Sequence, residues 1–574
     1  MWQSHAEFHV YICFFEIPVL TNLIGSPLTM ADLPPYPPIE PTTFDLIVIG
    51  TGLPLSIISA AASALGKSVL HLDSNTFYGT HFASLSIAEL SSFLQNPPPP
   101  PPQTGRDTTF VNLTTRPLYS DLDISNFAPD LLAEHSRSFH LDVSGPRVLF
   151  CADKSIEFLL KSGANQYLEF KSVDASFMGD GTGALWSVPD SRAAIFKDRS
   201  LGLQEKNQLM RFFKRVQEHL LSYAAEEEEE TSSRIAEEDL ESRFVEFLEK
   251  MRLPHKIKSI ILYAIAMSDY DQENIEDCKY VLKTRDGIDR LALYHASIGR
   301  LQNAPGALIY PMYGQGELPQ AFCRRAAVKG CIHVLRMPVT SLHLDRDNGC
   351  FKGIRLASGQ DIFSQKLVLD PALTVPLSSA SSLVGHQHVS LKDCSGKVAR
   401  AICITRRALK PDISNCLVIY PPRSLHPDQT TSIRVLQIGR NLAVCPPGMF
   451  VLYLSTLCDE GNQGKELLRL AINTLLTIPA PVNPDGNSSV ECENSHNKEV
   501  RSTLLWSALY VQELSMVEHD FISSAPMPDG KLSYNNLLDA TLKLFQKIYP
   551  DEEFFPETDL PDNSEEEGGL GLET

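Results

Sequence analysis

The feature that most constrains the fold of this chain is a buried strand that runs into a glycine turn and then a helix. Residues 44–50 read FDLIVIG, a continuous apolar run typical of a strand buried on both faces. After Gly50 and Gly52 comes LSIISAAASALG, which is small and apolar enough to form a helix packed closely on a sheet. The next strand, KSVLHLD, ends at Asp73. This order predicts an α/β domain with a Rossmann-like architecture of the FAD/NAD(P)-binding kind and mixed sheets.

The turn departs from the dinucleotide fingerprint at its third glycine. In such a turn the first glycine makes the tight bend, the second lets the backbone approach a pyrophosphate, and the third lets the helix pack near the strand. Gly50 and Gly52 supply the first two, but Leu55 replaces the third. Asp73 stands where an acidic residue would bind a ribose hydroxyl. The turn alone therefore leaves two hypotheses open, a site for FAD and a strand–turn–helix unit that holds no cofactor.

Length, net charge and cysteine spacing limit the number of domains, the class of partner and the kind of cysteine site that we expect. A chain of 574 residues exceeds one ordinary core, so we expect at least two domains. A net charge of −20 argues against nucleic acid as the main partner, because phosphate binding needs clustered Lys and Arg. The twelve cysteines include no C-x-x-C pair, which predicts reduced cytosolic thiols and neither a zinc site nor a disulfide framework.

The pattern along the chain predicts a helical domain inserted into the α/β domain. Within QEKNQLMRFFKRVQEHL, apolar residues from Leu209 to Leu220 recur at helical spacing on one stripe. An apolar stretch near the start contains Glu16 and Pro18, so we do not expect it to span a membrane. The expected segments are a disordered leader or gene-model extension (1–43), the first part of domain I (44–154, with a Pro-rich insertion at 91–109), helical domain II (155–272, with strands in 166–189 possibly returning to domain I), the remainder of domain I (273–550, with an insertion at 479–500) and an acidic disordered tail (551–574).

Two long stretches resemble one protein superfamily. FDLIVIGTGLPLSIISAAASALGKSVLHLDSNTFYGTHFASLS, from residue 44, resembles the amino-terminal segment of the Rab escort proteins and the Rab GDP-dissociation inhibitors. Residues 290–339 resemble the second hallmark block of that superfamily. The length of the chain and its insertion around the prolines favour the escort branch.

This resemblance implies a binding protein rather than an enzyme. The family has a flavoprotein-like domain I without flavin, so the turn of Gly50, Gly52 and Asp73 is expected to be vestigial and no cofactor or metal is expected. A member would bind GDP-bound Rab GTPases, present them to Rab geranylgeranyltransferase and carry the geranylgeranylated Rab to membranes. We therefore expect a cytoplasmic, non-catalytic accessory protein with transient membrane contact.

The resemblance also assigns a Rab-binding platform. Tyr78 in FYGT, and Glu317 and Arg324 in GELPQAFCR, match the platform positions of the family. The seven-residue spacing of Glu317 and Arg324 places them about two turns apart on one side of a continuous helix. Leu55 and Thr80 depart from the family pattern, which has Glu and Gly there. Without the surrounding block, Tyr78 would be read as a packing residue of a loop and Arg324 as a solvated residue.

The residues with which the family contacts the transferase are matched only in part by this sequence. The family uses a Phe and, eleven residues later, an Arg in the helical domain. Phe196 matches the first position, but the second is Asn207, beside Lys206, and Asn cannot supply a guanidinium fork. The alternative is that this helical face is solvated and that the contact is weak or built differently.

Two other functions remain as hypotheses. A Rab GDP-dissociation inhibitor would share the fold but would only recycle Rab, without presenting it to the transferase. A flavin-dependent oxidoreductase of the amine-oxidase type would share the architecture of domain I. The sequence contains no G-x-S-x-G, H-E-x-x-H or Walker motif that would mark another catalytic site.

Overall fold

The computed structural model divides the chain into two units, residues 1–40 and 41–574, and the helices and strands of the described residues all lie in the second. Among the described residues no helix is both long and apolar enough to cross a membrane. Phe196 and most of the expected leader, insertions and tail lie outside the described residues. The structure describes residues 37–95, 110–189, 202–224, 234–276, 278–345, 350–375, 390–392, 396–479, 501–514, 516–518, 522–556 and 571–572.

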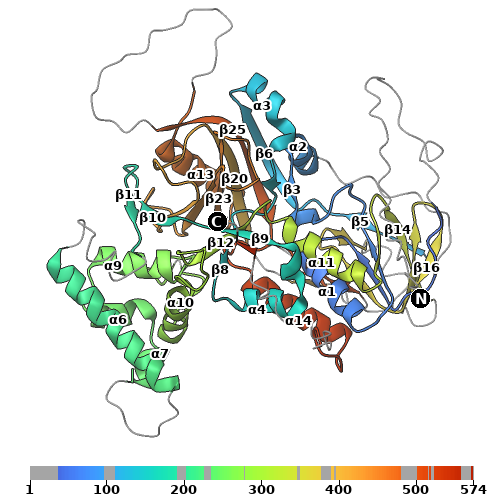
Figure 1. The fold of residues 1–574 in the computed structure, drawn as a ribbon, viewed down its shortest axis with the longest axis horizontal. Coiled ribbons are helices and arrows are strands. Elements are labelled where there is room, and N and C mark those ends of the chain that lie inside the picture. Colours follow the sequence, from blue (N-terminus) through green and yellow to red (C-terminus); the bar gives the residue numbers. More distant parts are fainter. Residues whose placement is uncertain are drawn as a thin grey trace, which may run out of the picture. The chain divides into compact units, whose positions relative to one another are not determined.

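The predicted Rossmann-like unit is confirmed, with a parallel sheet at its centre. All four residues of β1 are buried, and β1 pairs in parallel with β2 on one side and β17 on the other. Helix α1 begins directly after the glycine turn with Pro54 in its first turn, and it lies beside α11 (Figure 1). The sheet order is β13-β2-β1-β17-β27, made of Ile332–Val334, Val69–Leu72, Leu46–Ile49, Leu367–Leu369 and Ser523–Ser524, and the helices are α1 (Leu53–Ala64) and α11 (Glu317–Val328).

A larger mixed sheet forms the second core. Its central strands β20, β23 and β25 are long and almost wholly buried, and α13 (Gly461–Leu475) packs its apolar stripe against one face. The order is β11 (Leu185–Ser187), β10 (Ala175–Gly179), β21 (Cys416–Tyr420), β22 (Ile433–Ile438), β23 (Phe450–Cys458), β20 (Lys397–Thr405), β25 (Ser502–Glu513) and β24 (Leu476–Thr477), with β6 (Tyr119–Asn126) also pairing with β25.

Several smaller elements complete the two sheet regions. Strand β9 pairs with β12, and β10 with β21, so the strands expected within 166–189 belong to the sheets. The smaller strands are β8 (Leu149–Phe150), β9 (Glu169–Ser172), β12 (Leu308–Pro311), β3 (Ser84–Leu85), β7 (Leu141–Asp142), β4 (Phe110–Asn112), β14 (Val339–Leu344), β15 (Phe351–Leu356), β16 (Asp361–Phe363), β5 (Thr114–Thr115), β18 (Leu373–Thr374), β19 (Ser390–Lys392) and β26 (Met516–Glu518). The helices beside them are α2 (Ile87–Gln95), α3 (Pro129–His135), α4 (Lys154–Ser162) and α14 (Asn535–Ile548).

The helices that group together in the structure cover a different range of residues from the predicted 155–272. Helix α4 packs in the same core as α1, through Ile156 and Leu159, whereas α10 packs on α8 because Gly287 lets the ring of Phe244 approach. Figure 1 shows α6, α7, α9 and α10 gathered in one group. The group consists of α6 (Leu203–Ala224), α7 (Glu237–Glu241), α8 (Phe244–Lys250), α9 (His255–Ser259), the π-helical turn Ile260–Ile265 and α10 (Thr284–Ser297).

The expected disordered tail is also ordered in part. Phe554 and Phe555 pack against the ring of Phe158 on α4, and Glu552 pairs with Lys67 at 2.8 Å. Residues 571–572 form β28, which pairs in parallel with β9. Two adjacent aromatic residues order this segment despite the acidic residues around them. Burying each ring contributes more free energy to folding than the repulsion between exposed charges opposes.

Buried ion pairs join the helical group to the large sheet. The carboxylate of Asp269, which follows the π-helical turn, pairs with Arg434 of β22 at 2.6 Å and also with Lys531. Both Asp269 and Arg434 are buried. Burial alone would raise the pKa of Asp269, but the charges of Arg434 and Lys531 hold it below its usual value. This carboxylate therefore stabilises the fold above about pH 4, and that contribution is lost as the pH falls through its lowered pKa.

We predict that Asp269→Ala destabilises the protein by about 3–5 kcal/mol, because it leaves the buried guanidinium of Arg434 without its counter-charge. The measurement is urea unfolding followed by circular dichroism. Asp239→Ala is the matched control, because Asp239 pairs with Lys250 at 2.5 Å in an exposed position and should cost only about 0–1 kcal/mol. Equal losses in the two variants would contradict the role of Asp269.

Candidate functional site

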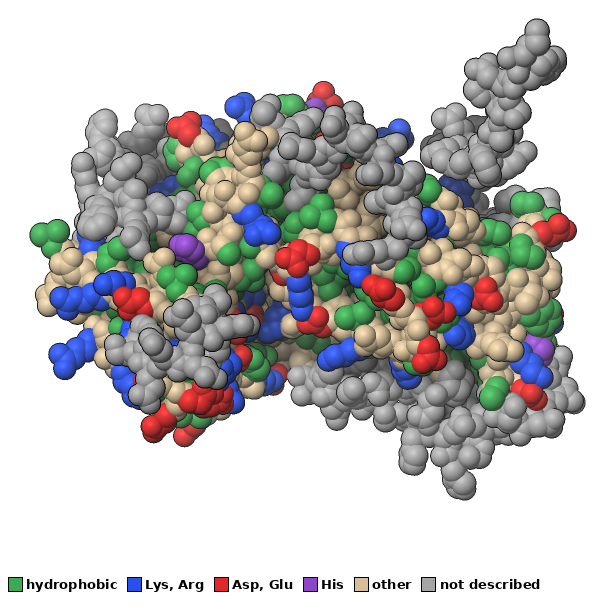
Figure 2. All heavy atoms as spheres, turned by 60° about the horizontal axis from the view of Figure 1, so that its bottom comes forward, with side chains coloured by type: hydrophobic (Ala, Val, Ile, Leu, Met, Phe, Trp, Pro, Cys, Tyr) green, Lys and Arg blue, Asp and Glu red, His purple; other side chains and the backbone are tan. Residues whose placement is uncertain are grey.

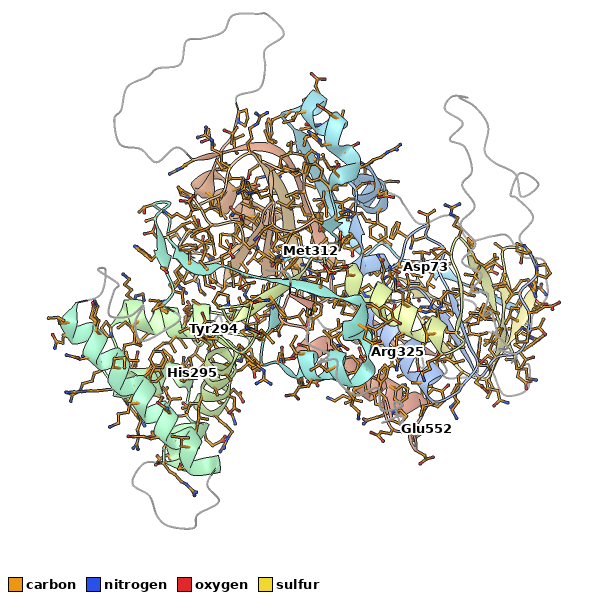
Figure 3. The ribbon with its side chains drawn as sticks, in the orientation of Figure 1. Asp73, Tyr294, His295, Met312, Arg325 and Glu552 are labelled. Atoms are coloured by element: carbon orange, nitrogen blue, oxygen red, sulfur yellow. The ribbon has the colours of Figure 1, made fainter. Side chains whose placement is uncertain are left out.

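The glycine turn is closed by hydrogen bonds within the chain. Asp73, which Figure 3 labels beyond β2, is almost fully buried, and its Oδ2 accepts from the backbone N–H of Thr51 at 2.8 Å and from the Thr51 hydroxyl at 2.6 Å. The hydroxyl of Thr80 also donates to Oδ2, at 2.9 Å, while Oδ1 accepts two bonds from Asn75. Burial raises the pKa of Asp73, and these donors oppose the rise.

A flavin or nicotinamide dinucleotide does not fit this turn. The carboxylate that would bind a ribose hydroxyl already accepts five hydrogen bonds from its own chain. Leu55 is buried, and its side chain lies 3.0 Å from where a Cβ on Gly50 would stand. Thr80, which departs from the family pattern, is thus one of the residues that donate a hydrogen bond to Asp73, the position of the acid that would bind a ribose.

A buried carboxylate fixes the turn that precedes α11. Asp142 of β7 accepts from the Ser84 hydroxyl at 2.6 Å, from the backbone N–H of Gln315 at 3.0 Å and from the Tyr310 hydroxyl. The Ser84 hydroxyl in turn accepts from the backbone N–H of Gly316 at 2.8 Å. Burial raises the pKa of Asp142 to about 6, against these donors.

Glycines are required where this turn meets β3. Gly314 has φ +94°, and a Cβ there would stand 2.5 Å from the Ser84 hydroxyl oxygen. A Cβ on Gly316 would stand 2.7 Å from the backbone nitrogen of Ser84. The sequence alone gave no role to Asp142 or Ser84, and the signal that could have pointed to them is the pair of glycines in YGQGE.

Glu317 and Arg324 both lie on α11 and line one hollow of about 510 Å³. Glu317 is the first residue of the helix, and its Oε2 accepts from the backbone N–H of Tyr313 at 3.0 Å. Arg324 is exposed, and Tyr313 and Glu169 line the same hollow. The neighbouring Arg325, labelled in Figure 3, donates from Nε to the Ser162 carbonyl at 3.0 Å and so pins α11 to the end of α4.

Glu317 has a strongly raised pKa in this hollow. Burial raises the pKa of Glu317 to about 7, and the charge of Glu169 adds to the rise, while the Tyr313 N–H and the Arg324 guanidinium oppose it. The side chain therefore titrates near physiological pH. An incoming cation would favour its charged form, so the hollow can accept a basic group from a partner.

Tyr78 lies beside α11 but is not among the residues that line this hollow. Its half-buried ring packs edge-on against His333 of β13, with ring centroids 6.3 Å apart. Burial raises the pKa of the Tyr78 phenol to about 12. The structure thus brings Glu317 and Arg324 together and places Tyr78 on a neighbouring part of the surface.

Of the two residues expected to contact a transferase, Asn207 lies within the described residues. Phe196 lies outside the described residues. Asn207 is exposed on α6, whereas Lys206 is buried and does not present its charge beside it. The apolar stripe of this helix is buried at Leu209, Phe212 and Val216, which leaves the face of Asn207 to solvent.

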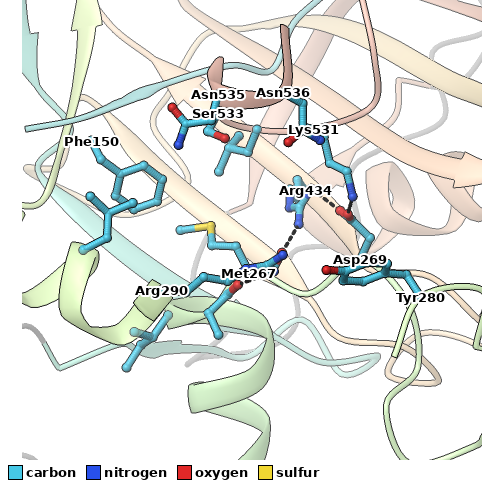
Figure 4. A pocket seen from close by; sticks show the side chains of 14 residues that line it. Phe150, Met267, Asp269, Tyr280, Arg290, Arg434, Lys531, Ser533, Asn535 and Asn536 are labelled. Carbon is cyan, nitrogen blue, oxygen red and sulfur yellow. Dashed lines mark hydrogen bonds and ion pairs between the residues drawn. The ribbon is translucent and has the colours of Figure 1, made fainter. Parts of the chain in front are cut away.

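A second hollow, of about 470 Å³, lies where the helical group meets the large sheet (Figure 4). One wall is apolar, with Phe150, Ile265 and Leu293. The other wall carries Arg434 and Lys531, both paired with Asp269, so its charged groups serve the junction between the two regions.

Surface charge does not mark a binding face by itself. In Figure 2, Lys and Arg side chains lie interspersed with Asp and Glu side chains over the described part of that face. Pairs such as Lys154–Asp539 at 2.5 Å and Lys161–Glu553 at 2.9 Å neutralise one another across elements distant in sequence. Charge alone therefore does not mark a binding surface on the face that Figure 2 shows.

Comparison with known proteins agrees with this architecture. A family model described as GDP dissociation inhibitor matches residues 41–127 and 102–483. The chain is 56% identical to Rab escort protein 1 of Arabidopsis thaliana, over 95% of this chain and 100% of that protein. It is 24% identical to Rab proteins geranylgeranyltransferase component A 1 of Homo sapiens, over 91% of this chain and 93% of that protein.

A solved structure shows the same fold at low sequence identity. The Rab GDI of Plasmodium falciparum aligns with a TM-score of 0.62 and 19% identity, covering 89% of this chain and 99% of that one. The resemblance expected from the two sequence blocks is confirmed by these matches. The chain belongs to the GDP dissociation inhibitor family and, within it, to the Rab escort proteins.

Proposed function

We propose that this chain binds GDP-bound Rab GTPases through α11 and its preceding turn, presents them to Rab geranylgeranyltransferase and carries the geranylgeranylated product to membranes. The observation that carries the proposal is the placement of Glu317 and Arg324 in one hollow on α11. Asp142 holds the turn before this helix by accepting a hydrogen bond from the backbone of Gln315. The names of the relatives, a Rab escort protein and component A of a Rab geranylgeranyltransferase, support it. The chain itself would perform no chemistry.

The charges on α11 suit a GTPase surface that carries both signs. Arg324 offers a planar cation for a carboxylate, and Glu317 offers a carboxylate for a Lys or Arg. Tyr78 adds a rigid ring with a polar tip, a combination frequent at interfaces. The turn is pinned by hydrogen bonds to Asp142 and Ser84, so binding would cost little backbone ordering.

Two alternatives are less well supported. A recycling inhibitor would use the same platform, so only the relationship to the escort proteins favours presentation to a transferase. A flavin-dependent oxidoreductase would need the dinucleotide turn, in which Asp73 is already bonded to Thr51, Thr80 and Asn75.

We predict that Arg324→Ala and Tyr78→Ala each weaken binding of a GDP-loaded Rab by about 1–4 kcal/mol, the range for truncation of an interface anchor. The measurement is isothermal titration calorimetry, with thermal melting to show that the fold is kept. Lys329→Ala is the control, because Lys329 is an exposed cation directly after the C-terminal end of α11 and does not line the hollow. Normal Rab binding by both variants would remove these residues from the platform.

We predict that Rab affinity rises between pH 6 and pH 8, because ionised Glu317 attracts a basic group and its pKa is about 7 in the free protein. The same raised pKa means that Glu317 stabilises the fold at low pH and that this contribution is lost as the pH rises through about 7. Glu317→Gln should bind more weakly at pH 8 and should lose this part of the pH dependence. An unchanged pH profile in Glu317→Gln would show that another group titrates.

For the transferase contact, we predict that Phe196→Ala weakens binding of the preformed Rab complex to the transferase and leaves Rab binding intact. Asn207→Arg should strengthen the transferase complex by about 0–1 kcal/mol, as an exposed pair does. Gln217→Arg adds the same charge elsewhere on α6 and should have no effect. The measurement is the affinity of the transferase for each preformed Rab complex at two salt concentrations. Unchanged affinity for the Phe196→Ala complex would show that the transferase docks on another surface of the chain.

A further inference from the structure

Three side chains that can bind a metal ion lie together in the core, and one of them contacts the ring of Tyr78. His71 of β2 and His333 of β13 are register partners in adjacent parallel strands, and Cys331 immediately precedes β13. One ring nitrogen of each histidine and the Cys331 sulfur lie within 4.8 Å of one another. The sulfur is 3.9 Å from Nε2 of His333, and the two imidazole centroids are 4.9 Å apart.

The hydrogen bonding of His71 leaves one of its ring nitrogens without a partner. It is fully buried, and its Nε2 lies 2.7 Å from the carbonyl oxygen of Gly50. A carbonyl only accepts, so Nε2 carries the proton and the lone pair of the neutral ring is on Nδ1. Nδ1 has no hydrogen-bond partner, although a buried polar atom normally has one. Metal-bound histidines are commonly held in this way, through a carbonyl on the second ring nitrogen.

We propose that His71, Cys331 and His333 form a binding site for a thiophilic d10 metal ion, Cu⁺ or Zn²⁺. Binding replaces the S–H bond of Cys331 by a sulfur–metal bond and releases one proton per ion, while both imidazoles bind as neutral donors. The cysteine spacing gave no hint of the site, because its ligands come from two strands about 260 residues apart in the chain and include no C-x-x-C pair.

The donor set and its surroundings favour Cu⁺ over Zn²⁺. A thiolate and two neutral imidazoles give a complex with no net charge around Cu⁺, but leave one positive charge around Zn²⁺ in a site whose neighbours Ser59 and the buried α1 face are uncharged. Structural Zn²⁺ prefers four ligands, whereas this group has three among the described residues. The ion could enter past His333, which is only half-buried.

The ordinary alternative is a pair of core histidines beside a buried thiol. It accounts for the contact of the Cys331 sulfur with the Ser59 hydroxyl at 3.3 Å, but not for the unpartnered Nδ1 of His71. An ion at this point would also fix the ring of His333, on which Tyr78 packs. The site therefore connects the core directly to the surface next to α11.

The test is competition of the full-length, reduced protein with a chromophoric Cu⁺ chelator under anaerobic conditions, and with a Zn²⁺ chelator in a parallel series. We expect one Cu⁺ per chain, with Zn²⁺ held more weakly, and release of one proton per ion. Co²⁺ should give a thiolate-to-metal charge-transfer band. Cys331→Ser should lose the band and weaken Cu⁺ binding by at least about 100-fold, more than the loss of an outer-shell partner.

Cys323→Ser is the matched control. Its thiol is also buried and also contacts a serine of α1, Ser56 at 3.3 Å, but it does not belong to the three-residue group. It should bind Cu⁺ normally. If Cys331→Ser fails to fold, as judged by circular dichroism, His333→Gln serves instead. Failure of the wild-type protein to hold one equivalent of either ion, or equal binding by Cys331→Ser or by a folded His333→Gln, would overturn the proposal.

Discussion

The proposed binding surface depends on one buried carboxylate. Asp142 takes hydrogen bonds from Ser84 and Tyr310 and from the backbone of Gln315, while its own N–H donates to the Tyr453 hydroxyl at 3.1 Å. These partners come from β3, β12, the turn before α11, and β23 of the large sheet. A single group thus joins the large sheet to β3, β12 and the turn before α11, and the hydrogen bonds that its carboxylate accepts offset the cost of burying its charge.

This arrangement shows how a Rossmann-like architecture would serve as the proposed protein-binding surface. The first turn of the Rossmann-like unit is filled from within, by Thr51, Thr80 and Asn75 around Asp73. The parallel sheet then acts as a rigid support for α11, whose outer face carries Glu317 and Arg324. The buried pairing of Asp269 with Arg434 of β22 holds the helical group on the large mixed sheet.

The sequence predicts the elements whose signal is local. The apolar run before Gly50, with Pro54 starting the helix, is enough to predict β1 and α1, and seven-residue spacing is enough to put Glu317 and Arg324 on one helix face. The hydrogen bonds of Asp142 and Asp73 were not predicted, because those of Asp142 reach up to 311 positions along the chain and only the glycine pair in YGQGE points toward them. The helical group extends past the predicted limit at residue 272, because α10 joins it through the contact of Gly287 with Phe244.

The central claim is tested most directly by reconstituted prenylation. A GDP-loaded Rab, Rab geranylgeranyltransferase and geranylgeranyl diphosphate are combined with and without this chain, and incorporation of the lipid into Rab is measured. The account predicts that incorporation depends on the chain and saturates with its concentration. Rab that binds the chain but gains no lipid would contradict it, and would identify the chain as a recycling inhibitor instead.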